Sequence, residues 1–171
     1  IYTGRSGFSG EFGHFSVFDN EIICRCGKKG CLETEVSGSA LHRILCEKVK
    51  NGQSSILSKR ILTGETSLTL EEIVDATNKE DILCIELVEE IGRKLGRYLA
   101  GLINLFNPEL VVIGGTLALT EDYILQPIKT AIRKYSLNLV SKDSAVVLSK
   151  LQAKAGVIGA CLLSRSKLFE W

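Results

Sequence analysis

Apolar and polar positions along much of the chain recur with the period of an α-helix. They predict five helices, over Ser39–Lys50, Thr69–Ala76, Lys79–Phe106, Asp122–Tyr135 and Ala155–Phe169. The second helix begins at a capping box, because Thr69 is followed three residues later by Glu72. The polar stretch over residues 51–67, which starts at the helix stop signal Asn51-Gly52, is predicted to be an exposed loop.

Short apolar runs between the helices predict strands. Leu110–Ile113 is a continuous apolar run that favours a buried parallel strand, and Ala145–Leu148 favours a second strand. Two more short strands are predicted at Phe15–Phe18 and Glu21–Cys24. Strands that alternate with helices indicate an α/β layer structure, and 171 residues are the length of one domain, residues 1–171.

Small residues recur every four positions on the longest predicted helix, at Gly92, Gly96 and Ala100. A glycine inside a helix costs about 1 kcal/mol relative to alanine, so a compensating contact is expected. We interpret the spacing as a close crossing with another helix, and a nucleotide-facing surface is the alternative. Charged residues on the same helix, such as Glu89 and Arg93, exclude a membrane-embedded helix pair.

Three cysteines lie within the eight residues Cys24-Arg25-Cys26-Gly27-Lys28-Lys29-Gly30-Cys31, and His14 precedes the first of them by ten positions. Three thiolates and one imidazole complete a tetrahedral zinc shell and leave no open position for a catalytic water. The pattern therefore predicts a zinc knuckle within residues 14–33. Its structural Zn²⁺ would be held by His14, Cys24, Cys26 and Cys31. The alternative is a group of buried, reduced cysteines beside an unrelated histidine.

Two carboxylates flank this cluster. Glu11 lies three residues before His14, and Glu33 lies two residues after Cys31. A metal ion would draw Glu11, His14 and Glu33 together, and the second imidazole nitrogen would stay free to hydrogen-bond outward. Such a group could hold the vicinal hydroxyls of a sugar through charge-assisted hydrogen bonds. The alternative is that both glutamates only support the metal ligands or lie in solvent.

Composition and charge exclude several classes of protein. A net charge of +1 gives no basic surface for a nucleic-acid backbone. No apolar run approaches the roughly twenty residues of a membrane span, and no signal peptide is visible. Cys46, Cys84 and Cys161 stand alone within helical patterns and are predicted to be small buried side chains. His42 is predicted to be a helix residue rather than a further metal ligand. We therefore expect a cytoplasmic protein.

Three segments carry a resemblance to a known family: Gly10–Gly38, which holds the Gly-Glu-Phe-Gly-His and Cys-x-Cys-Gly-x-x-Gly-Cys-Leu-Glu-Thr motifs, Asn107–Gly115 and Ala155–Ala160. On these segments the chain resembles the ROK family of repressors, open reading frames and sugar kinases. The resemblance implies the C-terminal lobe of an actin-like, ribonuclease-H-like ATPase fold with an inserted zinc knuckle. It implies the same zinc ligands as above, sugar contacts from Glu11, His14 and Glu33, and a nucleotide-facing glycine pair in kinase members, Gly114 and Gly115.

Several features of the kinase members are missing from the chain. It has no Asp-x-Gly-Gly-Thr phosphate loop, no Gly-x-Gly-x-Gly run and no aspartate in the setting of the family's catalytic base. These would precede Ile1, and the chain contains no methionine. We therefore expect the C-terminal portion of a longer protein, with no catalytic residue of its own in this part, which would not phosphorylate a sugar by itself.

Three functions are compatible with these observations. The first is the sugar-effector-binding and dimerisation domain of a sugar-responsive transcriptional regulator, whose helix-turn-helix would contact DNA from a segment before Ile1. The second is the C-terminal half of an ATP-dependent sugar kinase, for which ATP would be a cofactor. The third is a zinc-stabilised dimerisation module without a small-molecule role. We favour the first, with a sugar or sugar phosphate as ligand and a homodimer as the assembly.

Overall fold

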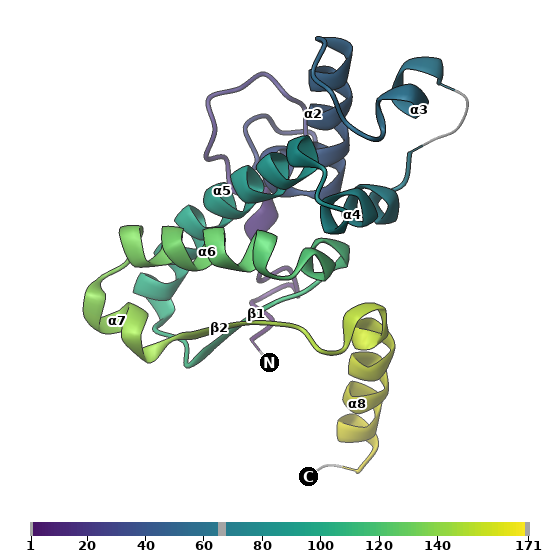
Figure 1. Cartoon of the computed structure of the whole chain (residues 1–171). Coiled ribbons are helices and arrows are strands. Elements are labelled where there is room, and N and C mark those ends of the chain that lie inside the picture. The colour runs from purple at the N-terminus through teal and green to yellow at the C-terminus, as the bar shows by residue number, and fades with distance from the viewer. Residues whose placement is uncertain (1, 65–67, 170–171) are drawn as a thin grey trace.

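A computed structural model describes residues 2–64 and 68–169 of the chain (Figure 1). Helices account for most of it, and two short strands lie between them. The elements are α1 (Glu33–Val36), α2 (Gly38–Lys50), α3 (Ser58–Thr63), α4 (Leu70–Asn78), α5 (Ile82–Phe106), β1 (Leu110–Ile113), α6 (Asp122–Tyr135), α7 (Asn138–Asp143), β2 (Ala145–Leu148) and α8 (Ala155–Phe169). Three 3₁₀ turns join them, at Phe12–His14, Thr116–Thr120 and Gln152–Lys154.

The five predicted helices are present, and side-chain caps mark the starts of α2, α4 and α5. The Ser37 hydroxyl accepts from the Ala40 N–H at the start of α2, and the predicted capping box of Thr69 and Glu72 opens α4. The prediction that the longest helix begins at Lys79 was wrong by three residues. Asp81 caps α5 by accepting from the Cys84 N–H, so α4 and α5 are separated by a turn.

The predicted exposed loop over residues 51–67 contains a helix, α3. The helix forms because Leu57 is buried in the core and Ile61 packs against it, so two apolar residues anchor an otherwise polar segment. Residues 65–67 of that prediction lie outside the described residues. Helix α7 was not predicted either.

The predicted strands at Phe15–Phe18 and Glu21–Cys24 are absent from the described structure. Both stretches run in extended loops that contact the cysteine segment through single bridges, between Ser16 and Cys31 and between Ile23 and Lys29. The polar turns of the cysteine segment interrupt a regular ladder, because two backbone hydrogen bonds there, including Cys24 N–H to Lys28 O at 2.8 Å, close a tight loop.

β1 and β2 form a two-stranded parallel sheet in which Leu110 pairs with Ala145 and Ile113 with Leu148. The strands and their parallel direction were predicted, but the prediction that β1 is buried was wrong, because Leu110 is 52% and Val112 is 53% exposed. The reason is that one face of the pair packs toward the helices, whereas the opposite face has no layer over it within the described residues.

The core lies where α5 meets the other helices, and its closest contact is with α6. Gly92 and Gly96 face the α6 backbone: a Cβ on Gly92 would lie 2.9 Å from Ile124 O, and one on Gly96 would lie 2.5 Å from Ile128 O. This confirms that the small residues mark a helix crossing. The buried side of α6 is formed by Ile124, Ile128, Ala131 and Ile132.

Helix α8 stands apart from the other helices (Figure 1). It was predicted to be amphipathic, yet exposed apolar side chains such as Val157 and Leu168 occur along its length. Cys161 on this helix is exposed, Cys46 is half-buried and Cys84 is buried, so the prediction of burial holds fully only for Cys84. None of the helices in the described ranges has the length and apolar character needed to cross a membrane.

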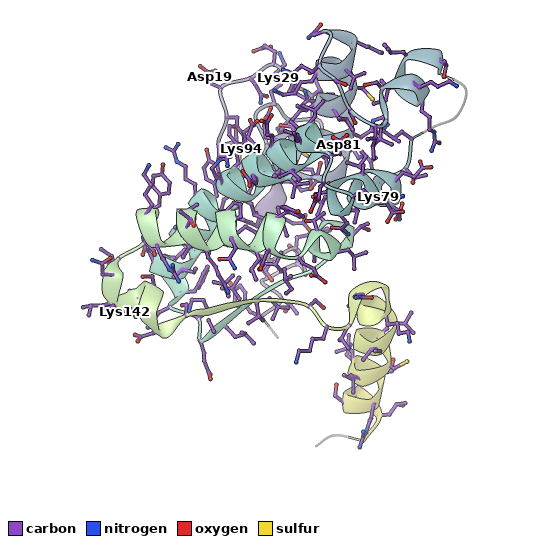
Figure 2. All side chains as sticks on the ribbon, viewed as in Figure 1. Asp19, Lys29, Lys79, Asp81, Lys94 and Lys142 are labelled. Atoms are coloured by element: carbon purple, nitrogen blue, oxygen red, sulfur yellow. The ribbon has the colours of Figure 1, made fainter. Side chains whose placement is uncertain are left out.

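Asp81 joins the start of α5 to the segment before α3 (Figure 2). Its Oδ1 accepts from the Cys84 N–H at 2.9 Å and its Oδ2 from the Ile56 N–H at 2.6 Å. Burial acts to raise the pKa of this carboxyl, but the two backbone hydrogen bonds outweigh it, and the net pKa is lowered. The charged form is therefore the stabilising one.

We expect Asp81→Ala to lower the free energy of unfolding at neutral pH by about 3 kcal/mol, since a helix cap and a second hydrogen bond are lost. Asp81→Asn should lower the free energy of unfolding by less. Its side-chain oxygen can still cap α5, whereas its NH₂ group cannot accept from the Ile56 N–H. Because the folded pKa is lowered, the contribution is complete above the unfolded pKa and disappears as pH falls through the folded one. Urea unfolding at several pH values measures this; equal pH profiles for parent and Asp81→Ala would contradict it.

Candidate metal centre

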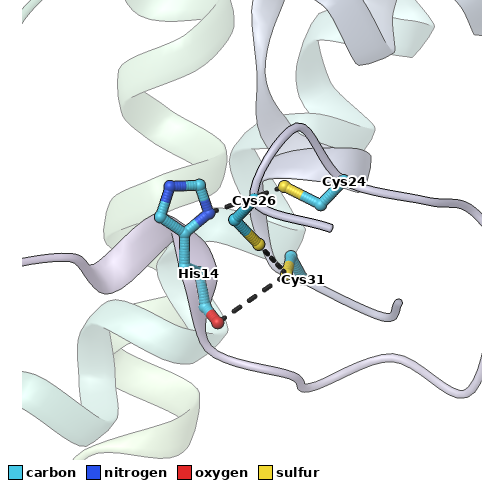
Figure 3. A group of neighbouring side chains, drawn as sticks. All are labelled: His14, Cys24, Cys26 and Cys31. Atoms are coloured by element: carbon cyan, nitrogen blue, oxygen red, sulfur yellow. Dashed lines mark hydrogen bonds between the residues drawn. The ribbon is translucent and has the colours of Figure 1, made fainter. Parts of the chain in front are cut away.

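Four side chains that can ligate a metal converge beside the first turn of α1. The ligand atoms of His14, Cys24, Cys26 and Cys31 all lie within 4.8 Å of one another, and they form the candidate metal group found among the described residues (Figure 3). Cys24 and Cys31 are buried, Cys26 is exposed, and the His14 side chain is 36% exposed. The structure thus brings together all four residues that the sequence predicted as ligands.

Their spacing fits a tetrahedral metal site. With bonds of about 2.3 Å to sulfur and about 2.0 Å to nitrogen, two sulfur ligands lie about 3.8 Å apart, and a sulfur and a nitrogen about 3.5 Å apart. The Cys26 and Cys31 Sγ atoms are 3.6 Å apart, and Cys24 Sγ is 3.5 Å from His14 Nδ1. The four side chains could therefore hold a metal ion with little rearrangement.

A bound metal ion would change the protonation state of the cysteines. Without one, burial raises the pKa of the Cys31 thiol to about 12, and the neighbouring cysteines add to the rise. The Lys28 backbone N–H lowers the pKa of Cys26. A metal ion would ionise the thiols together, because thiolates are the ligands that it binds.

The local backbone explains why the cysteines can converge. Gly27 and Gly30 have positive φ, at 82° and 71°. A side chain on Gly30 would collide with the carbonyl oxygen of Phe18. Without one, the two backbone segments approach closely, and the Val17 and Phe18 N–H groups both donate to Gly30 O. Only glycine fits this approach without strain, so the segment folds back on the preceding loop.

Contacts from α5 hold the knuckle segment, residues 14–33, and the adjoining α1 against the body of the protein. The Tyr98 hydroxyl on α5 donates to Val17 O at 3.0 Å, and its ring meets the edge of Phe18. Just beyond the segment, Glu35 accepts from Lys94 Nζ at 2.9 Å. Burial acts to lower the pKa of Lys94, but the carboxylates of Glu35 and Glu90 outweigh it and raise the pKa. The charged pair thus links α1 to α5.

His14 faces the cysteines on one side and a carboxylate on the other. Its Nδ1 lies toward Cys24 Sγ, and its Nε2 is 3.5 Å from Glu11 Oε2. Glu33 lies against the same turn, since its Oε2 is 2.8 Å from the point that a Cβ on Gly13 would occupy. The two glutamates and the histidine named from the sequence are therefore neighbours, and the Glu11 side chain is 58% exposed.

Gly114 and Gly115 lie away from this cluster, directly after β1. Gly115 has φ +86° and lines a hollow of about 310 Å³ together with Ser149, Lys150 and Gln152. The hollow is at the carboxyl ends of both strands, where open parallel sheets bind ligands. The two glycines form the tight junction between β1 and the following turn, and Gly115, but not Gly114, lines the hollow.

Sequence reasoning did not find several of these residues. A second hollow, of about 200 Å³, contains Glu33 together with Arg25 and Arg43. Neither arginine stands out in the sequence, because each belongs to a segment rich in charged residues. Lys150 likewise reaches the strand-end hollow from a stretch without a motif. The folded structure is needed to see that these cations line the same hollows as Glu33 and Gly115.

A known protein family matches nearly the whole chain. The sequence model of the ROK family matches residues 1–167. The chain belongs to the ROK family. Its relatives within the family include a glucokinase of Thermotoga maritima, 31% identical over 168 residues, and the DNA-binding transcriptional dual regulator NagC of Escherichia coli K12, 33% identical over 168 residues. Each alignment covers 98% of this chain, but 53% of the glucokinase and 40% of NagC.

Solved ROK structures have the same fold. A ROK family transcriptional regulator described as a homologue of the E. coli MLC protein superposes with a TM-score of 0.84 at 32% identity, over 96% of this chain and 40% of its own. A ROK family glucokinase from Streptomyces griseus, solved in complex with glucose and AMPPNP, superposes with a TM-score of 0.82 at 29% identity, over 96% of this chain and 54% of its own. The chain therefore has the ROK-family α/β fold and spans about half the length of these relatives.

Proposed function

We propose that this chain is the sugar-effector-binding and self-associating domain of a ROK-family transcriptional regulator, stabilised by structural zinc. The support comes from the likeness to NagC and to the ROK regulator structure. We propose that residues 1–171 act as one domain, because α5 packs against α1 beside the knuckle and against α6, and α6 in turn contacts β2. A DNA contact would come from another segment of the regulator.

Zinc is the metal that best suits the donor set of His14, Cys24, Cys26 and Cys31. Thiolate and imidazole ligands at tetrahedral spacing favour Zn²⁺, and four protein ligands make the site structural. When bound, zinc would cross-link the loop before Cys24 to the turn after it. The bond from His14 to the metal would also fix the orientation of its ring.

One observation carries the sugar proposal: the His14 ring joins the metal cluster to a carboxylate. If Nδ1 bound the metal, the proton would be on Nε2, which could then donate to Glu11 or to a sugar oxygen. Glu11 and Glu33 could accept from sugar hydroxyls, since Glu11 lies beside this ring and Glu33 lies against Gly13 in the same turn. The metal would thereby position a sugar-binding group without contacting the sugar.

A second candidate is the C-terminal half of an ATP-dependent sugar kinase. It is supported by the glucokinase relatives, and by the hollow next to Gly115, which offers Lys150 to an anionic ligand at the strand ends. In that case Gly115, and Gly114 behind it, would lie near the nucleotide. This part of the chain still carries no proposed catalytic residue.

The test of the sugar site is Glu33→Gln in the protein encoded by the whole gene. We expect the variant to retain metal and fold but to bind sugar about tenfold or more weakly, because a charged acceptor beside His14 becomes neutral. Isothermal titration with glucose, N-acetylglucosamine and xylose measures this; the sugars are those in the names of its relatives. Glu86→Gln, an exposed change on α5, is the control.

Unchanged sugar affinity in Glu33→Gln would remove that residue from the site. If none of the sugars binds the parent protein, the sugar-binding role is wrong, and the chain is better described as a zinc-stabilised dimerisation module without a small-molecule role. The same protein separates the two candidates: sugar-dependent release of DNA supports a regulator, and ADP formation with sugar and ATP supports a kinase.

A further inference from the structure

Helix α1 carries two carboxylates on different sides of a single turn. It spans only four residues, Glu33–Val36, and a helix this short is not stable by itself. Residues two positions apart on a helix do not face each other. Glu33 lies against Gly13 in the proposed sugar site, whereas Glu35 contacts side chains of the body of the protein.

The Glu35 carboxylate is held by side chains from three separate segments. Asn20 Nδ2 donates to its Oε1 at 3.1 Å, and Lys94 Nζ on α5 donates to its Oε2 at 2.9 Å (Figure 2). Arg43 on α2 is 3.7 Å from Oε1 and also donates to the Thr34 backbone carbonyl at 3.0 Å. Because the Glu35 side chain is only 15% exposed, water and salt screen these contacts less than those of a surface ion pair.

These contacts place Glu33 between two anchors. Cys31, a ligand of the proposed metal, precedes Glu33 by two residues, and Glu35 follows it by two. Thr34 joins the first anchor to the helix, because its Oγ1 donates to Cys31 O at 2.7 Å. One anchor of α1 would therefore depend on the metal, and the other depends on α2 and α5.

The two cations that contact Glu35 do not need it as a counter-ion. Lys94 is also 2.9 Å from Glu90 on its own helix, and Arg43 is 3.4 Å from Glu47 on its own helix. Each cation would thus keep a carboxylate partner if Glu35 were removed. The contacts with Glu35 serve instead to link α1 to these two helices.

We propose that Glu35 is a positioning residue for sugar binding, which orients Glu33 through its contacts with Lys94 and Arg43. Without these contacts α1 could turn about Cys31, and Glu33 would leave its place beside Gly13. Groups that orient a binding side chain commonly contribute tenfold or more to affinity. The inference rests on the proposed sugar site and adds the part of the fold that sets its geometry.

Isothermal titration on variants of the protein encoded by the whole gene tests this role. Lys94→Met keeps the apolar stem but removes the anchor on α5, and Glu35→Ala removes all three contacts. Each should bind the sugar that the parent binds, among glucose, N-acetylglucosamine and xylose, about tenfold more weakly and keep the metal content of the parent. Glu90→Gln is the control, because it removes the other carboxylate partner of Lys94 without touching α1, and it should have parental affinity.

A double-mutant cycle separates the positioning of Glu33 from a general effect on the fold. In a Glu33→Ala protein, adding Lys94→Met should weaken sugar binding no further, because the carboxylate that Lys94 positions is already absent. Circular dichroism confirms that each variant is folded before titration. If Glu35→Ala does not fold, Lys94→Met still gives the answer, since Glu35 then keeps Asn20 and Arg43.

Three results would overturn the positioning role and leave the sugar site in place. They are parental affinity in a folded Lys94→Met or Glu35→Ala protein, loss of metal from either, and a full tenfold effect of Lys94→Met in the Glu33→Ala background. Parental affinity in Glu33→Ala would instead remove Glu33 from the site, and the inference with it. A parent that binds none of the sugars would overturn the proposed sugar site itself.

Discussion

Replacing Cys26 by serine is expected to remove the metal and to lower the free energy of unfolding by about 4 kcal/mol, well above the usual effect of a surface substitution. Cys26 is exposed, so the change removes little packing, and the loss can be attributed to the ligand. Within the knuckle segment the backbone contacts are single bridges and turns rather than a sheet, so a metal would be its main internal cross-link. Chemical unfolding, with metal content measured on the same sample, gives both values.

Cys161→Ser is the matched control, since Cys161 is also exposed but lies on α8, away from the cluster. It should leave metal content and stability unchanged. A Cys26→Ser protein that loses its metal yet unfolds like the parent would contradict a structural role for the ion.

Gly96→Ala is expected to destabilise the protein by about 3 kcal/mol, although alanine is the better helix former. The new Cβ would lie 2.5 Å from Ile128 O and 2.8 Å from Ala131 Cβ. Neither atom is at the end of a flexible side chain, so α5 and α6 must move apart to make room. Thermal or urea unfolding measures the loss.

Gly101→Ala separates the crossing from helix propensity. Gly101 is on the same helix, and a Cβ there would meet nothing within 4 Å. This variant should be stabilised by up to about 1 kcal/mol. If both alanines stabilised the protein, the two helices would not be in the close contact described here.

Features coded by neighbouring residues were predictable from the sequence. The capping box at Thr69 needs only Glu72 three positions later. The spacing of the glycines on α5 indicates a close helix crossing, although it does not identify the partner helix. The convergence of His14 with the cysteines was also predictable, because a metal site requires its ligands to meet.

Features set by the tertiary structure were not predictable. α3 depends on two apolar residues, Leu57 and Ile61, reaching a core built from other segments. The bond between Glu35 and Lys94 joins positions far apart in the chain, and no local pattern links them. The exposure of Cys161 follows from the position of α8 away from the other helices, whereas its sequence pattern is that of a buried helix.

The central claim is that His14 and the three cysteines form a metal site that orders the neighbouring glutamates. Elemental analysis of the purified, reduced chain tests it most directly. We expect one zinc per chain, lost in Cys26→Ser and retained in Cys161→Ser. A folded, reduced chain that contains no zinc and takes up none from added Zn²⁺ would contradict the claim.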